Sequence, residues 1–211
     1  MKISIIIPVF NEKNTILQLY KKVQSVKGFQ KKLIIVDDGS SDGSRELIKN
    51  NIHSKNVKLF FHKKNLGKGA AIKTALKSIT GDFVIIQDAD LEYNPKDYHK
   101  LLRPFKKKKI KVVYGSRVLN KKRYSFKLSI AANFRVFSNH LLTTFSNIIN
   151  KQKLTDAHTC YKMVKSEIFQ SIDLKEKDFA FCPELNTKLS KLGIKIHEIP
   201  INYKGRTYDE G

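Results

Sequence analysis

The sequence has few cysteines, few acidic residues and no long apolar run. Its 211 residues include two cysteines, Cys160 and Cys182. Two cysteines make no disulfide framework, so we expect reduced thiols. No apolar stretch approaches the roughly 20 residues that a helix needs to cross a bilayer, and the N-terminus lacks the form of a secretory signal peptide. Together with the chain length, these absences predict a single domain over residues 1–211 in the cytoplasm.

The scarce acidic residues are also unevenly placed. The chain has 41 Lys and Arg against 19 Asp and Glu, which gives a formal net charge of +22. Between Tyr98 and Thr155 there is no acidic residue, whereas there are 15 basic ones. Such a block predicts a polyanionic partner, namely a nucleic acid, an anionic membrane or a phosphorylated substrate. Lysines on an ordinary solvated surface are the plainer alternative. With 41% hydrophobic residues the chain can bury a core, which excludes a disordered basic tail.

Short apolar runs alternate with helical patterns along the chain, which predicts an α/β fold with a mainly parallel central sheet flanked by helices. The expected strands are residues 2–8, 32–37, 57–62, 82–87 and 112–116, followed by 159–164 and 194–203. The expected helices are residues 14–26, 42–50, 68–78 and 95–105, followed by a long segment over 125–150 and a last helix over 183–192.

Polar side chains cluster where four of the expected strands end. Because parallel sheets bind ligands outside the carboxyl ends of their strands, these clusters predict one common site. The clusters are Phe10-Asn11-Glu12, Asp37-Asp38-Gly39-Ser40, Asn65-Leu66-Gly67-Lys68-Gly69 and Asp88-Ala89-Asp90.

Asp88 and Asp90 are the sharpest chemical signal. Two carboxylates just beyond an apolar strand can reach one divalent cation, and hard oxygen ligands suit Mg²⁺ or Mn²⁺. The alternative is an acidic turn before the helix that Asn94-Pro95 begins. The Asp37-Asp38-Gly39-Ser40 segment also has two interpretations: its residues suit a strand-to-helix turn, or one Asp accepts hydrogen bonds from a ribose or a base.

The Gly67-Lys68-Gly69 segment opens an expected helix, where amide groups and a lysine can face a phosphate. It is not a dinucleotide-binding fingerprint, because the third glycine is missing and the segment follows the third strand. The Walker pattern G-x-x-x-x-G-K-[ST] occurs nowhere in the chain. Arg117 closes the fifth strand and brings a guanidinium near the same edge. Glu184 is expected at a helix N-terminus, where capping is its plainer role.

These motifs together resemble family 2 glycosyltransferases with the GT-A fold, in the branch related to dolichyl-phosphate mannose and glucose synthases. The resemblance covers essentially the whole chain. It rests on Ile6-Ile7-Pro8-Val9-Phe10-Asn11-Glu12, Val36-Asp37-Asp38-Gly39-Ser40, Asn65-Leu66-Gly67-Lys68-Gly69, Gln87-Asp88-Ala89-Asp90, Gly115-Ser116-Arg117, Thr159-Cys160-Tyr161-Lys162 and Gly205-Arg206-Thr207-Tyr208.

The resemblance implies an inverting hexosyltransferase that uses a nucleotide-diphosphate sugar, a polyprenyl phosphate acceptor and Mg²⁺ or Mn²⁺. Residues 1–117 would form the nucleotide-sugar half and residues 118–211 the acceptor- and membrane-facing half. Asp88 and Asp90 would bind the metal. Asp90, Arg117 and Asp156 are the expected catalytic residues. Asp156 is assigned to orientation or active-site electrostatics, with base catalysis as the alternative. The expected nucleotide-sugar contacts are Pro8, Phe10, Glu12, Asp38, Lys68, Asp88, Ala89, Arg117 and Arg206.

Apolar residues in the 125–150 segment recur at helical spacing and form one face, next to the basic Lys121-Lys122-Arg123. Core packing is the common explanation of such a face, and a helix that lies in a membrane interface is the alternative. A helix in the membrane interface would make this a peripheral protein at the inner face of the membrane. A separate membrane partner is a further expectation. A glycan or another lipid remains an alternative acceptor. A basic nucleic-acid-binding module is the rival class, but we expect no nucleic acid because it leaves the acidic strand ends unexplained.

Overall fold

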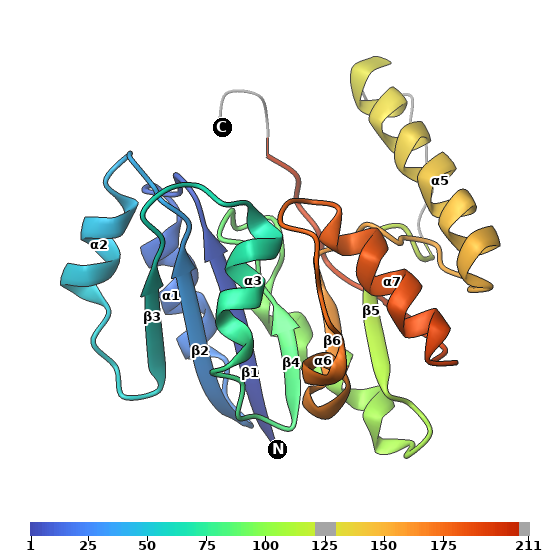
Figure 1. Ribbon diagram of the computed structural model, residues 1–211, viewed down its shortest axis with the longest axis horizontal. Coiled ribbons are helices and arrows are strands. Elements are labelled where there is room, and N and C mark those ends of the chain that lie inside the picture. The colour runs from blue at the N-terminus through green and yellow to red at the C-terminus, as the bar shows by residue number, and fades with distance from the viewer. Residues whose placement is uncertain (121–129, 207–211) are drawn as a thin grey trace.

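The structure is a computed structural model that describes residues 1–120 and 130–206. A seven-stranded sheet forms its centre, in the order β3-β2-β1-β4-β6-β5-β7 (Figure 1). The strands are β1 (Lys2–Val9), β2 (Gln30–Asp37), β3 (Val57–Phe61), β4 (Phe83–Ile86), β5 (Val112–Ser116), β6 (Lys162–Lys165) and β7 (His197–Pro200).

Most neighbouring strands run parallel, as predicted. β1 pairs in parallel with β2 and β4, β2 with β3, and β5 with β7, whereas β6 is antiparallel to β4 and β5. Ile3, Ile5, Ile6 and Ile7 are all fully buried. Both faces of a parallel sheet are covered by helices, so a strand such as β1 carries a continuous run of buried apolar residues instead of alternating.

The helices flank the sheet, with α3 and α7 in front of it in Figure 1 and α1 behind it. The prediction of a single helix over 95–105 is wrong. This segment forms two 3₁₀ turns, Pro95–Asp97 and Arg103–Lys106, with the short helix α4 between them. Pro104 lacks the N–H that continues an α-helix, so α4 ends before it. The helices are α1 (Ile16–Ser25), α2 (Ser44–Asn51), α3 (Lys68–Leu76), α4 (Tyr98–Leu102), α5 (Ile130–Asn150), α6 (Ser166–Ser171) and α7 (Phe181–Lys191).

Two late strands begin later than expected, and α6 is not predicted by the pattern. The Lys162 amide donates to the Cys160 carbonyl at 2.7 Å, so a tight turn precedes β6. β7 is likewise shorter than the expected 194–203, because the chain leaves the sheet after residue 201 and approaches the segment after β4 instead.

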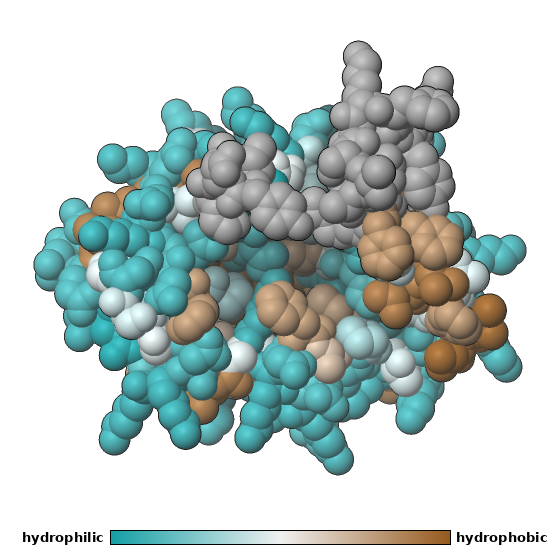
Figure 2. Space-filling model, turned by 90° about the horizontal axis from the view of Figure 1, so that it is seen from above, coloured by the Kyte–Doolittle hydropathy of each residue, from teal (hydrophilic) through white to brown (hydrophobic). Residues whose placement is uncertain are grey.

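Helix α5 presents its apolar face outward, so core packing is the wrong explanation of that face. Thr143 and Asn150 are buried on the opposite side, and α5 packs against α7. Figure 2 shows the brown apolar side chains gathered at the end of the molecule that carries α5. The predicted start of this segment at 125 and the basic residues 121–123 lie outside the described residues. No described helix has the length and apolarity needed to cross a bilayer. The exposed apolar side chains of α5 are Phe134, Phe137, Leu141, Leu142, Phe145, Ile148 and Ile149.

Candidate functional site

One pocket of about 390 Å³ lies at the carboxyl ends of β1, β2 and β4. It unites residues from all four polar strand ends, as the sequence predicts for a parallel sheet. Two further residues, Asp178 and Phe179, come from the segment before α7. The pocket is lined by Pro8, Val9, Phe10, Glu12, Asp38, Asn65, Gly67, Lys68, Asp88, Ala89, Asp90, Asp178 and Phe179.

Asp88 and Asp90 place two carboxyl groups in this pocket. The Lys68 ammonium forms an ion pair with Asp88, and the Asp90 carboxylate accepts a hydrogen bond from the Glu92 amide at 3.0 Å. Burial and the nearby Asp88 charge raise the pKa of Asp90 to about 7. Crowded oxygen ligands of this kind fit Mg²⁺ or Mn²⁺. The described residues contain no group of three or more His, Cys, Asp or Glu side chains able to hold a metal.

The two carboxylates after β2 have different partners. Asp37 is fully buried and forms an ion pair with Arg45 of α2. Asp38 accepts hydrogen bonds from the Leu66 and Gly67 amides at 3.0 and 2.8 Å, and contacts His62 Nδ1 at 2.6 Å. Asp38 therefore lines the pocket and also shapes the turn before α3.

The glycines around Lys68 allow another segment to approach closely. We call residues 173–180, which join α6 to α7, the strap. Gly67 has φ +95°, and a Cβ there would overlap the Lys177 carbonyl. The Ala70 amide donates to the same carbonyl oxygen at 2.9 Å. This amide is used within the protein, so the expectation that the amides of this helix start face a phosphate does not hold for Ala70.

Glu184 anchors the strap instead of capping its own helix. Its carboxylate accepts hydrogen bonds from the Lys175 and Glu176 amides at 2.6 and 3.0 Å, and from Lys188 Nζ at 2.6 Å. Phe179 then reaches the pocket, where its ring centroid lies 5.7 Å from Lys68 Nζ. The sequence analysis missed the strap, because its contacts join segments about 110 residues apart and leave no local pattern.

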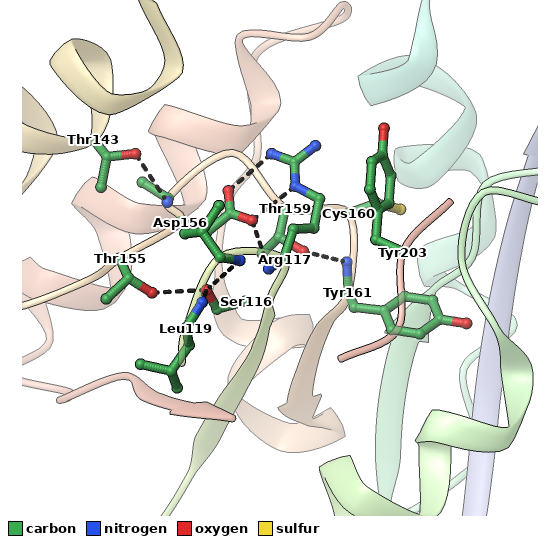
Figure 3. A network of polar contacts seen from close by, with 12 residues as sticks. Ser116, Arg117, Leu119, Thr143, Thr155, Asp156, Thr159, Cys160, Tyr161 and Tyr203 are labelled. Atoms are coloured by element: carbon green, nitrogen blue, oxygen red, sulfur yellow. Dashed lines mark hydrogen bonds and ion pairs between the residues drawn. The ribbon is translucent and has the colours of Figure 1, made fainter. Parts of the chain in front are cut away.

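Arg117 and Asp156 form a second cluster, outside the residues that line the pocket (Figure 3). The Arg117 guanidinium donates to both Asp156 oxygens at 2.7 and 2.8 Å, and its amide donates at 3.0 Å. Burial opposes ionisation of Asp156, but the bonds from Arg117 lower its pKa overall. Glu198 accepts the Thr155 and Asp156 amides at 2.6 and 3.0 Å and so holds this turn. The sequence analysis also missed Glu198.

Arg206 reaches the pocket from the opposite end of the chain. Its guanidinium bonds to the Glu12 carboxylate and to the Asp90 carbonyl, the latter at 3.0 Å. With Asp90 and Leu91, it lines a space that adjoins the pocket. Thr207 and Tyr208 of the same motif lie outside the described residues.

The chain is similar in sequence to known glycosyltransferases. Residues 4–173 match the family model described as Glycosyl transferase family 2. The chain is 26% identical over 216 residues to a dolichyl-phosphate beta-glucosyltransferase of Trichomonas vaginalis, covering 95% of this chain and 65% of that relative. It is 36% identical over 106 residues to an undecaprenyl-phosphate 4-deoxy-4-formamido-L-arabinose transferase of Proteus mirabilis, covering 48% of this chain and 32% of the relative.

The fold is also found among solved structures. Glucosyl-3-phosphoglycerate synthase of Mycobacterium tuberculosis, in complex with Mn²⁺, UDP and glucosyl-3-phosphoglycerate, matches with a TM-score of 0.70 at 18% identity. The match covers 99% of this chain and 74% of that one. Another structure of the same enzyme, with Mg²⁺ and UDP, gives a TM-score of 0.72 at 19% identity and covers 99% of this chain and 73% of that one. These matches confirm the predicted α/β fold of the GT-A type.

Proposed function

The chain belongs to glycosyl transferase family 2, and on this premise we propose that it is an inverting hexosyltransferase. It moves a hexose from a nucleotide-diphosphate sugar to a polyprenyl phosphate at the cytoplasmic face of a membrane. The observation that carries the proposal is the single pocket that joins Asp88 and Asp90 to Asp38, Glu12 and Lys68. Two relatives named for dolichyl phosphate and undecaprenyl phosphate support the acceptor class.

Different residues of the pocket bind different parts of the donor. Pro8, Phe10, Glu12 and Asp38 hold the nucleoside, because they line the end formed by β1 and β2. Asp88 and Asp90 would hold Mg²⁺ or Mn²⁺, which neutralises charge on the diphosphate leaving group when bound. Lys68 forms an ion pair with Asp88, so its ammonium would lie beside the diphosphate of a donor bound through a cation on Asp88 and Asp90.

Arginine residues stabilise the charge that develops on the leaving group. Arg206 lies beside Asp90, and Arg117 lies in the neighbouring cluster. Asp156 uses both oxygens on Arg117, so we assign it to positioning this guanidinium. The acceptor phosphate is already mostly ionised at neutral pH, so the reaction requires no strongly tuned base. Direct attack of that phosphate on the anomeric carbon inverts the centre and gives a β-linked product from an α-linked donor.

The exposed face of helix α5 supports the proposed position at the membrane that holds the acceptor. Its phenylalanine and leucine side chains, with Ile148 and Ile149, face outward, whereas Thr143 and Asn150 face the protein. A helix that packs on a core has the reverse arrangement. Residues 98–155 contain no carboxylate and 15 basic residues. An apolar face within a basic segment fits an interface of anionic lipids.

A donor panel tests this function. The protein is incubated with polyprenyl phosphate, Mg²⁺ or Mn²⁺ and several nucleotide-diphosphate hexoses, and lipid-linked hexose is detected by mass spectrometry. We expect transfer from one donor. We also expect Asp90→Asn to reduce kcat at least about 100-fold, because a developing charge loses its preorganised stabilisation.

Asp82→Asn is the matched control, because Asp82 directly precedes β4, at the end of this strand opposite to Asp90, and its carboxylate accepts the Lys2 amide at 2.8 Å. It should retain activity. Transfer to a glycan or a phosphorylated small molecule, but to no polyprenyl phosphate, would overturn the acceptor assignment and leave the reaction class in place. A gel shift with nucleic acid at physiological salt, without sugar transfer, would favour the rival class.

A further inference from the structure

Glu92 lies two residues after the Asp88-Ala89-Asp90 triplet, and both of its carboxylate oxygens accept hydrogen bonds from the C-terminal segment. Tyr203 donates its hydroxyl to Oε2 at 2.8 Å, and the Arg206 amide donates to Oε1 at 2.8 Å. The Lys204 amide adds a bond to the Glu92 carbonyl at 3.0 Å. A β-bridge between Tyr93 and Tyr203 extends this pairing. Residues 203–206 are therefore fastened to the segment that follows Asp90.

The Tyr203 ring lies against the other arginine of the site. The Arg117 guanidinium carbon is 5.2 Å from the centroid of this ring, within the range of a cation–π contact. Tyr93 packs edge-on against Tyr203, with centroids 5.2 Å apart, and fixes the ring from another side. Burial and the bond to Glu92 raise the pKa of Tyr203 to about 12, so the phenol remains a donor at neutral pH.

Tyr203 and the segment that Glu92 holds thus contact or carry both arginines, while Asp156 holds Arg117 from another side. Arg206 follows Tyr203 by three residues and contacts the Asp90 carbonyl and Glu12, whereas Arg117 stacks on the ring itself. We propose that Glu92 and Tyr203 are a positioning pair that holds Arg117 and Arg206 toward the donor diphosphate, and that Glu92 is not a ligand of the metal. This inference rests on the proposed function, because it presupposes a donor diphosphate between these arginines.

Binding measurements separate positioning from ligation. Mn²⁺ affinity is measured by electron paramagnetic resonance without nucleotide, and affinity for UDP and GDP by calorimetry with Mn²⁺; the tighter nucleotide is kept. Glu92→Ala should leave the Mn²⁺ Kd within about twofold. It should weaken nucleotide binding about tenfold or more, because hydrogen bonds to a charged group are lost. Tyr203→Phe, which retains the ring, should weaken nucleotide binding less.

The double variant Glu92→Ala/Tyr203→Phe should bind the nucleotide no more weakly than Glu92→Ala, because both changes break the same bond. Glu46→Gln, on the exposed side of α2, is the control and should match the wild type. A Mn²⁺ Kd raised about tenfold or more in Glu92→Ala identifies a metal ligand and overturns the inference. Unchanged nucleotide binding in both Glu92→Ala and Tyr203→Phe also overturns it.

The result is separable from the proposed function. If the wild type binds a nucleoside diphosphate but transfers no sugar to polyprenyl phosphate, the acceptor assignment fails while the variants still decide the role of the pair. If the wild type binds neither nucleotide, the positioning pair has no diphosphate to serve and the inference falls.

Discussion

At the scale of single residues, the site is organised by carboxylates that each serve a defined neighbour. Asp38 shapes the turn before α3, Asp156 holds Arg117, Glu92 holds the segment around Tyr203, and Glu184 holds the strap. Asp90 differs, because its pKa is raised to about 7 by burial and by Asp88 instead of being lowered by a basic partner. Because the charged form of Asp90 is destabilised in this way, a bound cation would stabilise its carboxylate strongly.

The Arg117–Asp156 pair gives a stability prediction with a defined pH dependence. Its bonds lower the pKa of Asp156 below the ordinary value of about 3.9. Because the folded-state pKa is the lower one, the pair stabilises the protein above about pH 4 and loses this contribution as the pH falls through the folded-state pKa. Asp156→Asn should therefore reduce the free energy of unfolding at pH 7 by about 2–4 kcal/mol.

Urea unfolding at pH 7, 5 and 3.5 measures this difference. The gap between the wild type and Asp156→Asn should narrow at pH 3.5, because Asp156 of the unfolded chain is then mostly protonated and the ionised carboxylate favours the folded state less. Equal stability at pH 7, or a gap that widens on acidification, would show that the carboxylate does not stabilise the guanidinium.

Residue types at strand ends could be predicted from the sequence, but their partners could not. The Asp88-Ala89-Asp90 triplet has a local signature, because two oxygen ligands follow an apolar strand. The bond from Tyr203 to Glu92 spans 111 residues and has none. The same holds for Glu198, which holds the turn at Thr155 and Asp156 from 42 and 43 residues away.

At the scale of elements, the strap and α3 approach so closely that only glycine fits between them. Gly67→Ala places a methyl group against the Lys177 carbonyl and also forces a side chain into a backbone conformation with φ +95°. Left-handed strain costs about 1–2 kcal/mol, and an overlap that cannot relax costs about 1–3 kcal/mol more. We expect a loss of about 2–5 kcal/mol in the free energy of unfolding, together with faster hydrogen exchange at the Ala70 amide.

Gly193→Ala is the matched control, because Gly193 also has a positive φ of +68° but no atom within 4 Å of the added methyl group. Its cost should be limited to the backbone strain. Equal losses from Gly67→Ala and Gly193→Ala in urea unfolding would mean that the strap does not press on the start of α3.

The outward apolar face of α5 gives a prediction at the same scale. Phe137 and Phe145 are 51% and 55% exposed, so replacing both by serine removes little packing from the protein. In flotation with vesicles of anionic and neutral lipid at physiological salt, the double variant should bind at least about tenfold more weakly, because each buried aromatic side chain contributes about 1.5–3 kcal/mol.

Leu192→Ser is the control, since Leu192 is 57% exposed but lies at the end of α7. Unchanged flotation of the Phe137→Ser/Phe145→Ser double variant would contradict the membrane assignment. A wild-type dimer that this double variant converts to a monomer, in size-exclusion chromatography with light scattering, would assign the face to a second copy of the chain.

Element types followed from hydrophobic periodicity, but their surroundings did not. A period of 3.6 residues predicts an apolar face on 125–150 and says nothing of whether protein, water or lipid covers it. The interrupted helix around α4 shows a different limit. There the pattern remained helical while Pro104 removed the backbone donor that an α-helix needs.

At the scale of the whole molecule, parallel strand topology is what assembles the pocket. β1, β2 and β4 are adjacent and parallel, so polar segments that are up to about 80 residues apart meet at one edge. The chain as a whole is basic, with a net charge of +22, whereas this edge of the sheet gathers acidic residues. A basic exterior favours an anionic surface, while the acidic edge favours a cation and the donor that it accompanies.

The stereochemistry of the product tests the central claim most directly. The chain is incubated with the donor that it accepts, a divalent cation and polyprenyl phosphate, and the purified lipid is analysed by NMR at the anomeric position. Our account predicts a hexose attached through phosphate to the lipid, in the β configuration from an α-linked donor. An α-linked lipid product would contradict direct inverting transfer, and no lipid-linked hexose with any donor would contradict the acceptor.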